Sequence, residues 1–121
     1  MLNVNKWLAD ALAAGGIHLP ACEEPMLRQV SGSYITWEHG ETTTLRASGI
    51  PYEQRYRVTL LLWLTPDDLW QSWLMDITAA LMRFDTESSV TCYVGMSRGA
   101  RDVPEVGRKL VQLEVQLVDR M

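Results

Sequence analysis

The chain has 121 residues, of which 47% are hydrophobic and 21% charged, and its formal net charge is −4. This length and composition predict a single globular domain over residues 1–121 and exclude a disordered chain. The acidic balance excludes nucleic-acid binding as the main activity, because contact with a phosphate backbone needs a basic surface.

A first helix is predicted over residues 4–14, where apolar residues recur at helical spacing. Asn3 is the candidate N-cap, and Gly15-Gly16 is a stop, since glycine accepts the left-handed conformation that closes a helix. Asp10 interrupts the apolar stretch, so the helix does not resemble a signal peptide. No apolar run reaches the roughly 20 residues of a membrane helix, and we expect an intracellular protein without membrane contact.

Residues 17–33 contain two prolines and are predicted to form a connection with one short strand over residues 27–30. The alternation and strand-forming residues of 34–38 predict a strand, and residues 39–41 predict a turn after it.

Two interpretations of the next segment remain open. Either residues 42–46 pair back on the preceding strand as a hairpin, or residues 40–51 form an extended polar arm. The segment has strand propensity but few residues that suit a core, so an arm would be exposed or would pair with another subunit.

Residues 52–64 predict the longest strand, with all even-numbered residues on one face. The other face begins with Glu53 and Arg55 but ends with Leu61 and Trp63. This pattern indicates a strand that is half-exposed at its start and covered on both faces at its end.

A second helix is predicted to follow directly. Thr65 is its expected N-cap, Pro66 its first residue, and Asp67 and Asp68 suit the positive end of its dipole. Residues 85–88 are expected to end it. The apolar stripe of this helix consists of Leu69, Trp70, Trp73, Leu74, Ile77, Ala80, Leu81 and Phe84.

The C-terminal part predicts two strands, residues 89–97 and 110–118, joined by a loop over residues 98–109 that carries most of the local basic charge. Such a connection favours an antiparallel pair. Cys92 alternates with two valines and is expected to point into the core. Together the elements predict an α+β fold, with a mainly antiparallel sheet of four to five strands and two helices packed on one face.

The sequence contains no phosphate-binding loop, nucleophile elbow or zinc-protease motif. Its two cysteines lie far apart and have no metal-like spacing to either histidine, which suits reduced thiols in a cytosolic protein. His39, beside Glu38 and Glu41, is the one candidate general base. A histidine in a polar turn is far more often only a turn residue, so we expect no enzyme, no cofactor and no metal site.

The arrangement of elements resembles the tail-terminator and tail-completion proteins of long-tailed bacteriophages and prophages. The resemblance covers nearly the whole chain but includes no signature motif. Five segments carry it, namely the helix ending at Gly15-Gly16, the strand at 34–37, the polar arm before Tyr52, the strand at 57–64 that leads into a Pro-Asp-Asp helix start, and the strand at 113–117.

This resemblance implies a small α+β subunit that assembles, usually as a hexameric ring, on the head-proximal end of the tail tube. The ring would stop tube growth and present a docking surface to the head connector or neck protein. Such a protein would occur in the host cytoplasm and in the virion tail. The resemblance implies no catalytic residue.

Within the role that the resemblance implies, we expect the basic residues to face an acidic tube, connector or neighbouring subunit. Arg98, Arg101 and Arg108 are the strongest candidates, and their replacement by glutamate is expected to leave the fold intact and to abolish assembly. The full set of predicted subunit or tube contacts is Arg46, Arg55, Arg57, Arg98, Arg101, Arg108 and Lys109.

Two other functions remain open at this point. The chain could be a small α+β ligand-sensing or interaction domain that dimerises through its sheet, with a pocket near the tryptophan-rich strand–helix junction. It could also be a hydrolase that uses His39. A stable dimer in light scattering would favour the sensing domain, and loss of activity in a His39→Ala variant would favour the enzyme.

Overall fold

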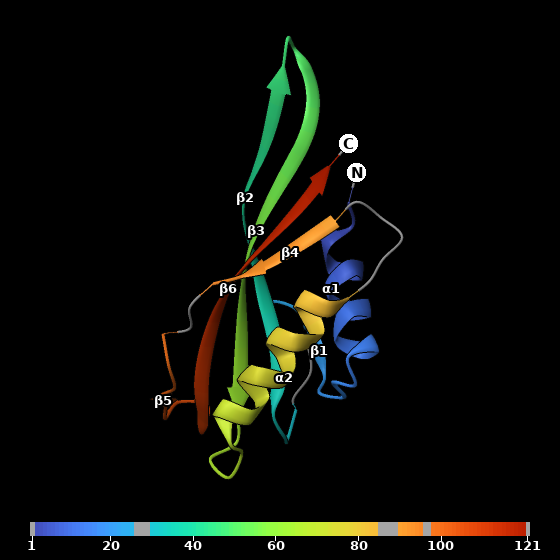
Figure 1. Cartoon of the computed structure of the whole chain (residues 1–121). Coiled ribbons are helices and arrows are strands. Elements are labelled where there is room, and N and C mark those ends of the chain that lie inside the picture. Colours follow the sequence, from blue (N-terminus) through green and yellow to red (C-terminus); the bar gives the residue numbers. More distant parts are fainter. Residues whose placement is uncertain (1, 26–29, 85–89, 96–97, 121) are drawn as a thin grey trace.

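The computed structural model describes residues 2–25, 30–84, 90–95 and 98–120. Figure 1 shows a twisted sheet with the two helices beside it and a long hairpin that extends away from them. In chain order the elements are α1 (Val4–Ala14), β1 (Ala21–Glu23), β2 (Tyr34–Ala47), β3 (Ile50–Leu64), α2 (Trp70–Arg83), β4 (Val90–Val94), β5 (Arg101–Val103) and β6 (Arg108–Arg120).

The sheet is mixed and has six strands in the described residues. Its order is β1-β2-β3-β6-β4, and β5 pairs with β6 off this path. β1 and β2 run parallel, whereas all other pairs are antiparallel. The α+β class is therefore confirmed, and most strand pairs are antiparallel as predicted, but the sheet is mixed and the predicted number of four to five strands is too low. The unpredicted strands, β1 and β5, have three residues each, too few to show a periodic pattern.

Both ends of α1 form as the sequence predicts. The Asn3 side chain accepts a hydrogen bond from the backbone N–H three residues on, at 3.1 Å. At the other end Gly16 has a φ of +79°, and the N–H of Ile17 donates to the carbonyl of Leu12 at 2.9 Å. This is the bond of a Schellman motif, so Gly16 is the left-handed residue that closes the helix.

One hydrophobic core joins the helices to the sheet. It contains the predicted stripe of α1, the even-numbered residues of β3 from Tyr56 onward and the odd-numbered residues of β6 from Val111 to Leu117. From α2 it includes Ile77, Ala80 and Leu81. The other residues of the predicted stripe are half-buried, except Leu69, which precedes the helix and is exposed.

β3 has the predicted two halves. Arg55 and Arg57 are exposed near its start, whereas Leu61 is buried near its end. The Trp63 ring stacks on Tyr34 with centroids 5.9 Å apart. The end of the strand is therefore covered on both faces, as its continuous apolar run predicts.

The predicted turn at residues 39–41 is wrong, because β2 continues through it and pairs with β3 on both sides. The pairing register shifts between His39 and Thr42, which marks a bulge rather than a turn. Gly40 sits at this bulge, where a Cβ would approach the Arg57 carbonyl oxygen to 3.2 Å. Residues 42–46 consequently do not fold back on β2, and the interpretation as an extended arm is the correct one.

The chain reverses at Ser48 and Gly49, whose φ angles are +52° and +78°. Two consecutive residues with positive φ are typical of a type I′ turn, whose twist matches that of the flanking strands. The observed hairpin thus joins β2 to β3, and β3 begins at Ile50 rather than at Tyr52.

α2 begins at Trp70, so the prediction that Thr65 caps it is wrong. Residues 65–68 form a separate turn, in which the N–H of Asp68 donates to the Thr65 carbonyl at 3.1 Å. The Asp68 carboxylate accepts hydrogen bonds from the hydroxyls of Ser33 and Thr65. Long-range bonds to Ser33 therefore override the local capping preference.

The predicted loop over residues 98–109 contains β5 and a turn, and β6 starts at Arg108. β4 and β6 form the predicted antiparallel pair, and Cys92 is buried as expected. The predicted strand at 27–30 lies outside the described residues except for Val30, and the predicted end of α2 at 85–88 lies wholly outside them.

Candidate interaction surfaces

The most prominent surface is the end of the β2–β3 hairpin, residues 41–52, which we call the arm. β1 pairs with β2 only at residues 35–37, and β6 pairs with β3 only as far as Glu53. Within the described residues the two strands of the arm therefore pair only with each other. Figure 1 shows the arm projecting from the body of the sheet.

The arm exposes apolar side chains at its tip. Ile50 is 67% exposed and Tyr52 is 47% exposed. They lie two residues apart on β3, beside the register shift between Leu45 and Arg46, and both are exposed near the turn. Arg46 donates to the Gly49 carbonyl at 3.3 Å, which brings its guanidinium to the turn. A two-stranded ribbon is marginally stable in water, so an apolar tip on such a ribbon is typical of a contact element.

A second surface is a groove of about 450 Å³ that crosses the sheet on the face of Arg55 and Arg57. We call it the polar groove. Its charges are mixed, since Glu41 and Glu114 lie beside the two arginines. Arg55 is paired with Glu53 at 2.7 Å. The remaining lining residues are Thr43, Tyr93, Val94, Gly95, Val115 and Gln116.

The seven predicted contact residues are dispersed. Arg55 and Arg57 line the polar groove, and Arg46 lies at the tip of the arm. Arg57, Arg98 and Arg101 have no hydrogen-bond or ion-pair partner among the described residues, and all three are exposed. Their positively charged groups are therefore available to a partner. Lys109 lies half-buried at the start of β6.

Arg108 differs from the other six, because its guanidinium bonds several backbone carbonyls of a distant segment of the chain. Its Nη2 donates to the carbonyls of Val30, Ser31 and Gly32 at 3.0, 3.2 and 3.2 Å. The guanidinium also lies 5.9 Å from the centroid of the Tyr34 ring. We therefore expect an Arg108→Glu replacement to weaken the fold, so this residue does not suit a test of assembly.

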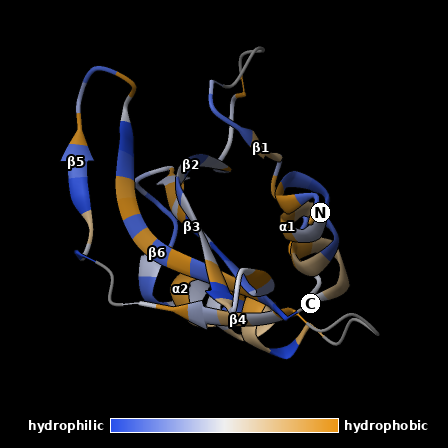
Figure 2. Cartoon of the chain, turned by 90° about the horizontal axis from the view of Figure 1, so that it is seen from above, coloured by the Kyte–Doolittle hydropathy of each residue, from blue (hydrophilic) through white to orange (hydrophobic). Residues whose placement is uncertain are grey.

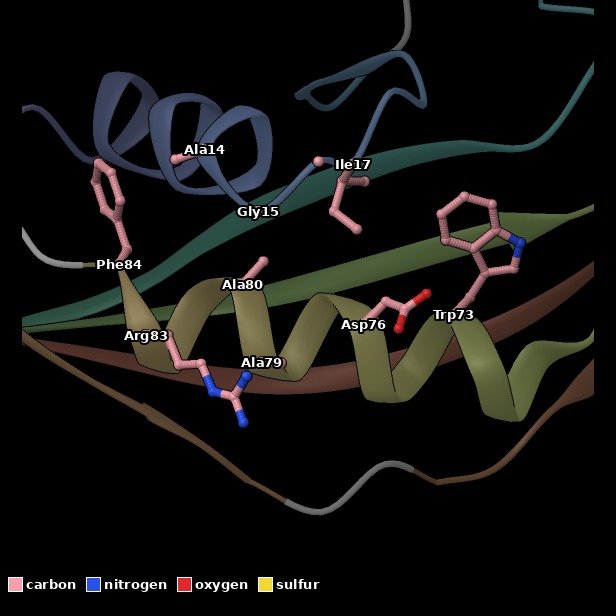
Figure 3. A pocket seen from close by; sticks show the side chains of 10 residues that line it. Ala14, Gly15, Ile17, Trp73, Asp76, Ala79, Ala80, Arg83 and Phe84 are labelled. Atoms are coloured by element: carbon pink, nitrogen blue, oxygen red, sulfur yellow. The ribbon is translucent and has the colours of Figure 1, made fainter.

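A third surface lies between the C-terminal end of α1 and α2. This helix groove has a volume of about 560 Å³ and is shown in Figure 3. Trp73 and Phe84 lie at its two ends, with Ala79 and Ala80 between them on α2. The Asp76 side chain points toward the α1 side and has no partner among the described residues, whereas Arg83 points away from α1.

The helix groove has small residues at its centre because α1 and α2 approach closely there. A Cβ on Gly15 would overlap the Cβ of Ala80 and lie 2.9 Å from its Cα. No sequence pattern indicates this close approach. The exposed tip of the arm, by contrast, has a signal in the alternating Ile50 and Tyr52 beside a Ser-Gly turn.

The surroundings of His39 differ from the sequence prediction. Its Nε2 lies 2.8 Å from Asn5 Oδ1 and 3.4 Å from Glu23 Oε1. Glu38 instead interacts with Glu24, and the hydrogen bond between them, followed by their charge repulsion, raises the pKa of Glu38. Neither Glu38 nor Glu41 orients the imidazole, so the predicted base and carboxylate are not brought together.

The described residues contain no cluster of three or more side chains suited to a metal ion. Burial raises the pKa of the Cys92 thiol to about 12, which makes it a poor nucleophile. Among the described residues, neither helix is both long enough and apolar enough to cross a bilayer. The sequence matches no protein-family model and no curated protein.

Proposed function

We propose that this protein is a tail-terminator or tail-completion protein of a long-tailed phage or prophage. It would form a ring, usually hexameric, on the head-proximal end of the tail tube, stop tube polymerisation and present a docking surface to the head connector or neck protein. Its sites of action would be the host cytoplasm and the virion tail.

The arm is the observation that carries this proposal. A ribbon with an apolar tip, whose strands pair with no other strand in the described part of the chain, gains stability when another molecule covers it. A terminator needs such an element, because it must hold the end of a polymer or its own neighbours in a ring. Arg57, Arg98 and Arg101, which pair with none of the described residues, add positive charge that can face an acidic tube surface.

The placement of the helices agrees with this role. We infer that α1 and α2 cover the same face of the sheet, because their buried residues share a core with the even-numbered residues of β3. The opposite face would then present the polar groove. A subunit with one covered face and one accessible face can contact different molecules on its two sides, as a ring at the end of a tube must.

Deletion of the gene from its phage or prophage, followed by electron microscopy of the particles, tests the proposal. We expect tails of uncontrolled length that lack heads, and restoration of normal tails by the wild-type gene. A gene carrying Arg57→Glu, Arg98→Glu and Arg101→Glu should produce a folded protein that fails to restore them. Normal tails in the deletion strain would refute the proposal, and a stable dimer in light scattering would favour a sensing domain instead.

A further inference from the structure

We propose that the tip of the arm docks into the helix groove of a second copy of this chain. The inference rests on the proposed ring and specifies which two surfaces meet in it. Ile50 and Tyr52 would enter the groove between Trp73 and Phe84, and Arg46 would pair with Asp76 of the neighbouring copy.

The two surfaces are chemically complementary. The tip offers two exposed apolar side chains and one cation. The helix groove offers two aromatic rings, a floor of alanines and the anion Asp76, and its one cation, Arg83, points away from α1. Asp76 has no ion-pair partner among the described residues, and Arg46 bonds only one carbonyl, at 3.3 Å. An arginine has five N–H donors, so most of its capacity remains for a carboxylate.

The polar groove fits the tip less well. It holds two arginines, which would repel Arg46, whereas the helix groove holds one, Arg83. Its lining is also mainly polar, whereas burying Ile50 and Tyr52 is favourable only against apolar groups. The helix groove is therefore the preferred acceptor for the tip.

The geometry requires a second copy. Figure 1 shows the arm extending away from both helices, and Figure 2 shows the same molecule along the direction in which the arm projects. The tip thus cannot reach the groove of its own chain. A contact between two different surfaces is heterologous, and repeating it yields a ring when the rotation closes.

Cysteine cross-linking in a Cys22→Ser background tests the contact. Cys92 can stay, because it is buried and its raised pKa keeps the thiol protonated. A chain with Tyr52→Cys and Ala79→Cys is expected to give a ladder of covalent oligomers on mild oxidation. The matched control combines Tyr93→Cys with Ala79→Cys, because Tyr93, at 49% exposed, is as accessible as Tyr52, at 47%.

Single-cysteine chains reveal the symmetry. Oxidation of the Tyr52→Cys chain alone, or of the Ala79→Cys chain alone, should give no covalent dimer. Oxidation of a mixture of the two chains should give one covalent dimer. Absence of the ladder, an equal ladder from the Tyr93 control, or dimers of Tyr52→Cys alone would each overturn the inference.

The cross-linking experiment and the gene deletion test the docking of the arm and the role in the tail separately. Tails that lose length control in the deletion strain, together with no ladder, would refute only the docking of the arm. A ladder from a chain whose deletion leaves tails normal would refute only the role in the tail.

Discussion

Two buried tryptophans differ in how their indole N–H groups are satisfied. Trp37 Nε1 donates to Asn5 Oδ1 at 2.8 Å. Trp7 Nε1 is buried without a hydrogen-bond partner among the described residues, although the ring makes an edge contact with Phe84 at a centroid distance of 5.3 Å. An unsatisfied buried donor lowers stability, because its hydration is lost without compensation.

Replacing each tryptophan by phenylalanine should therefore have unequal effects. Both changes remove similar volume, but Trp37→Phe also breaks a hydrogen bond and should cost about 1–3 kcal/mol more than Trp7→Phe. Urea unfolding of the two variants and the wild type measures the difference. If Trp7→Phe destabilises the protein as much as Trp37→Phe, its N–H has a partner that this account lacks.

At the scale of elements, side chains on both faces join the short strand β1 to β2. On one face the Asn5 side chain of α1 donates to Glu23, which lies beside His39. On the other face the carboxyl group of Glu24 accepts a hydrogen bond from Thr36 at 2.7 Å and meets Glu38. The edge of the sheet thus contains a carboxyl pair that repels when both members are ionised.

This pair predicts a pH dependence. The pKa of Glu38 is higher in the folded chain, mainly through its hydrogen bond with Glu24, so the folded state favours the protonated form. The resulting stabilisation is present at acidic pH and is lost as the pH rises through the folded pKa.

Glu38→Gln keeps a donor for Glu24 at every pH, so the variant should exceed the wild type in melting temperature at neutral pH. The gain should vanish on acidification through the pKa of Glu38. Glu41→Gln, exposed on the same strand, is the control and should show no such trend. A gain that persists in acid would contradict the account.

Local patterns in the sequence determine the elements that local forces stabilise. The cap at Asn3, the closing glycine and the two halves of β3 all depend on neighbours in sequence, and each was predictable. The start of α2 was not, because Asp68 bonds Ser33, which is 35 residues away.

The candidate surfaces also differ in whether neighbouring residues or distant contacts determine them. The arm could be predicted from its composition, since residues 40–51 contain few that suit a core. The helix groove depends on the approach of Gly15 to Ala80, and the engagement of Arg108 depends on three carbonyls that no side-chain pattern reveals. Contacts made by backbone atoms of distant segments leave no mark in the sequence.

For the whole molecule, β6 is the strand that unites the sheet. It pairs with β3 along one side and with β4 and β5 along the other. Its inward residues, from Val111 to Leu117, are all buried. Unfolding of the body should therefore require the loss of β6, whereas the arm can open by itself.

Amide hydrogen exchange should reveal this hierarchy. The amides of β6 between Val111 and Leu117 that bond β3 should exchange only through global unfolding, with the slowest rates in the described residues. The amides of the arm should exchange orders of magnitude faster in the isolated protein. Equal protection of the two regions would mean that the arm is stabilised in the absence of any partner.

The position of β6 in the chain also governs the order of folding. The arm closes around a two-residue turn, and hairpins of this kind form within about 1–10 μs. β6 follows β3, β4 and β5 in sequence, so the body of the sheet waits for a long loop to close. A growing chain would consequently display its arm before the sheet against which its helices pack is complete. Under the proposed docking, two nascent copies would each donate and accept an arm only after the last strand is in place.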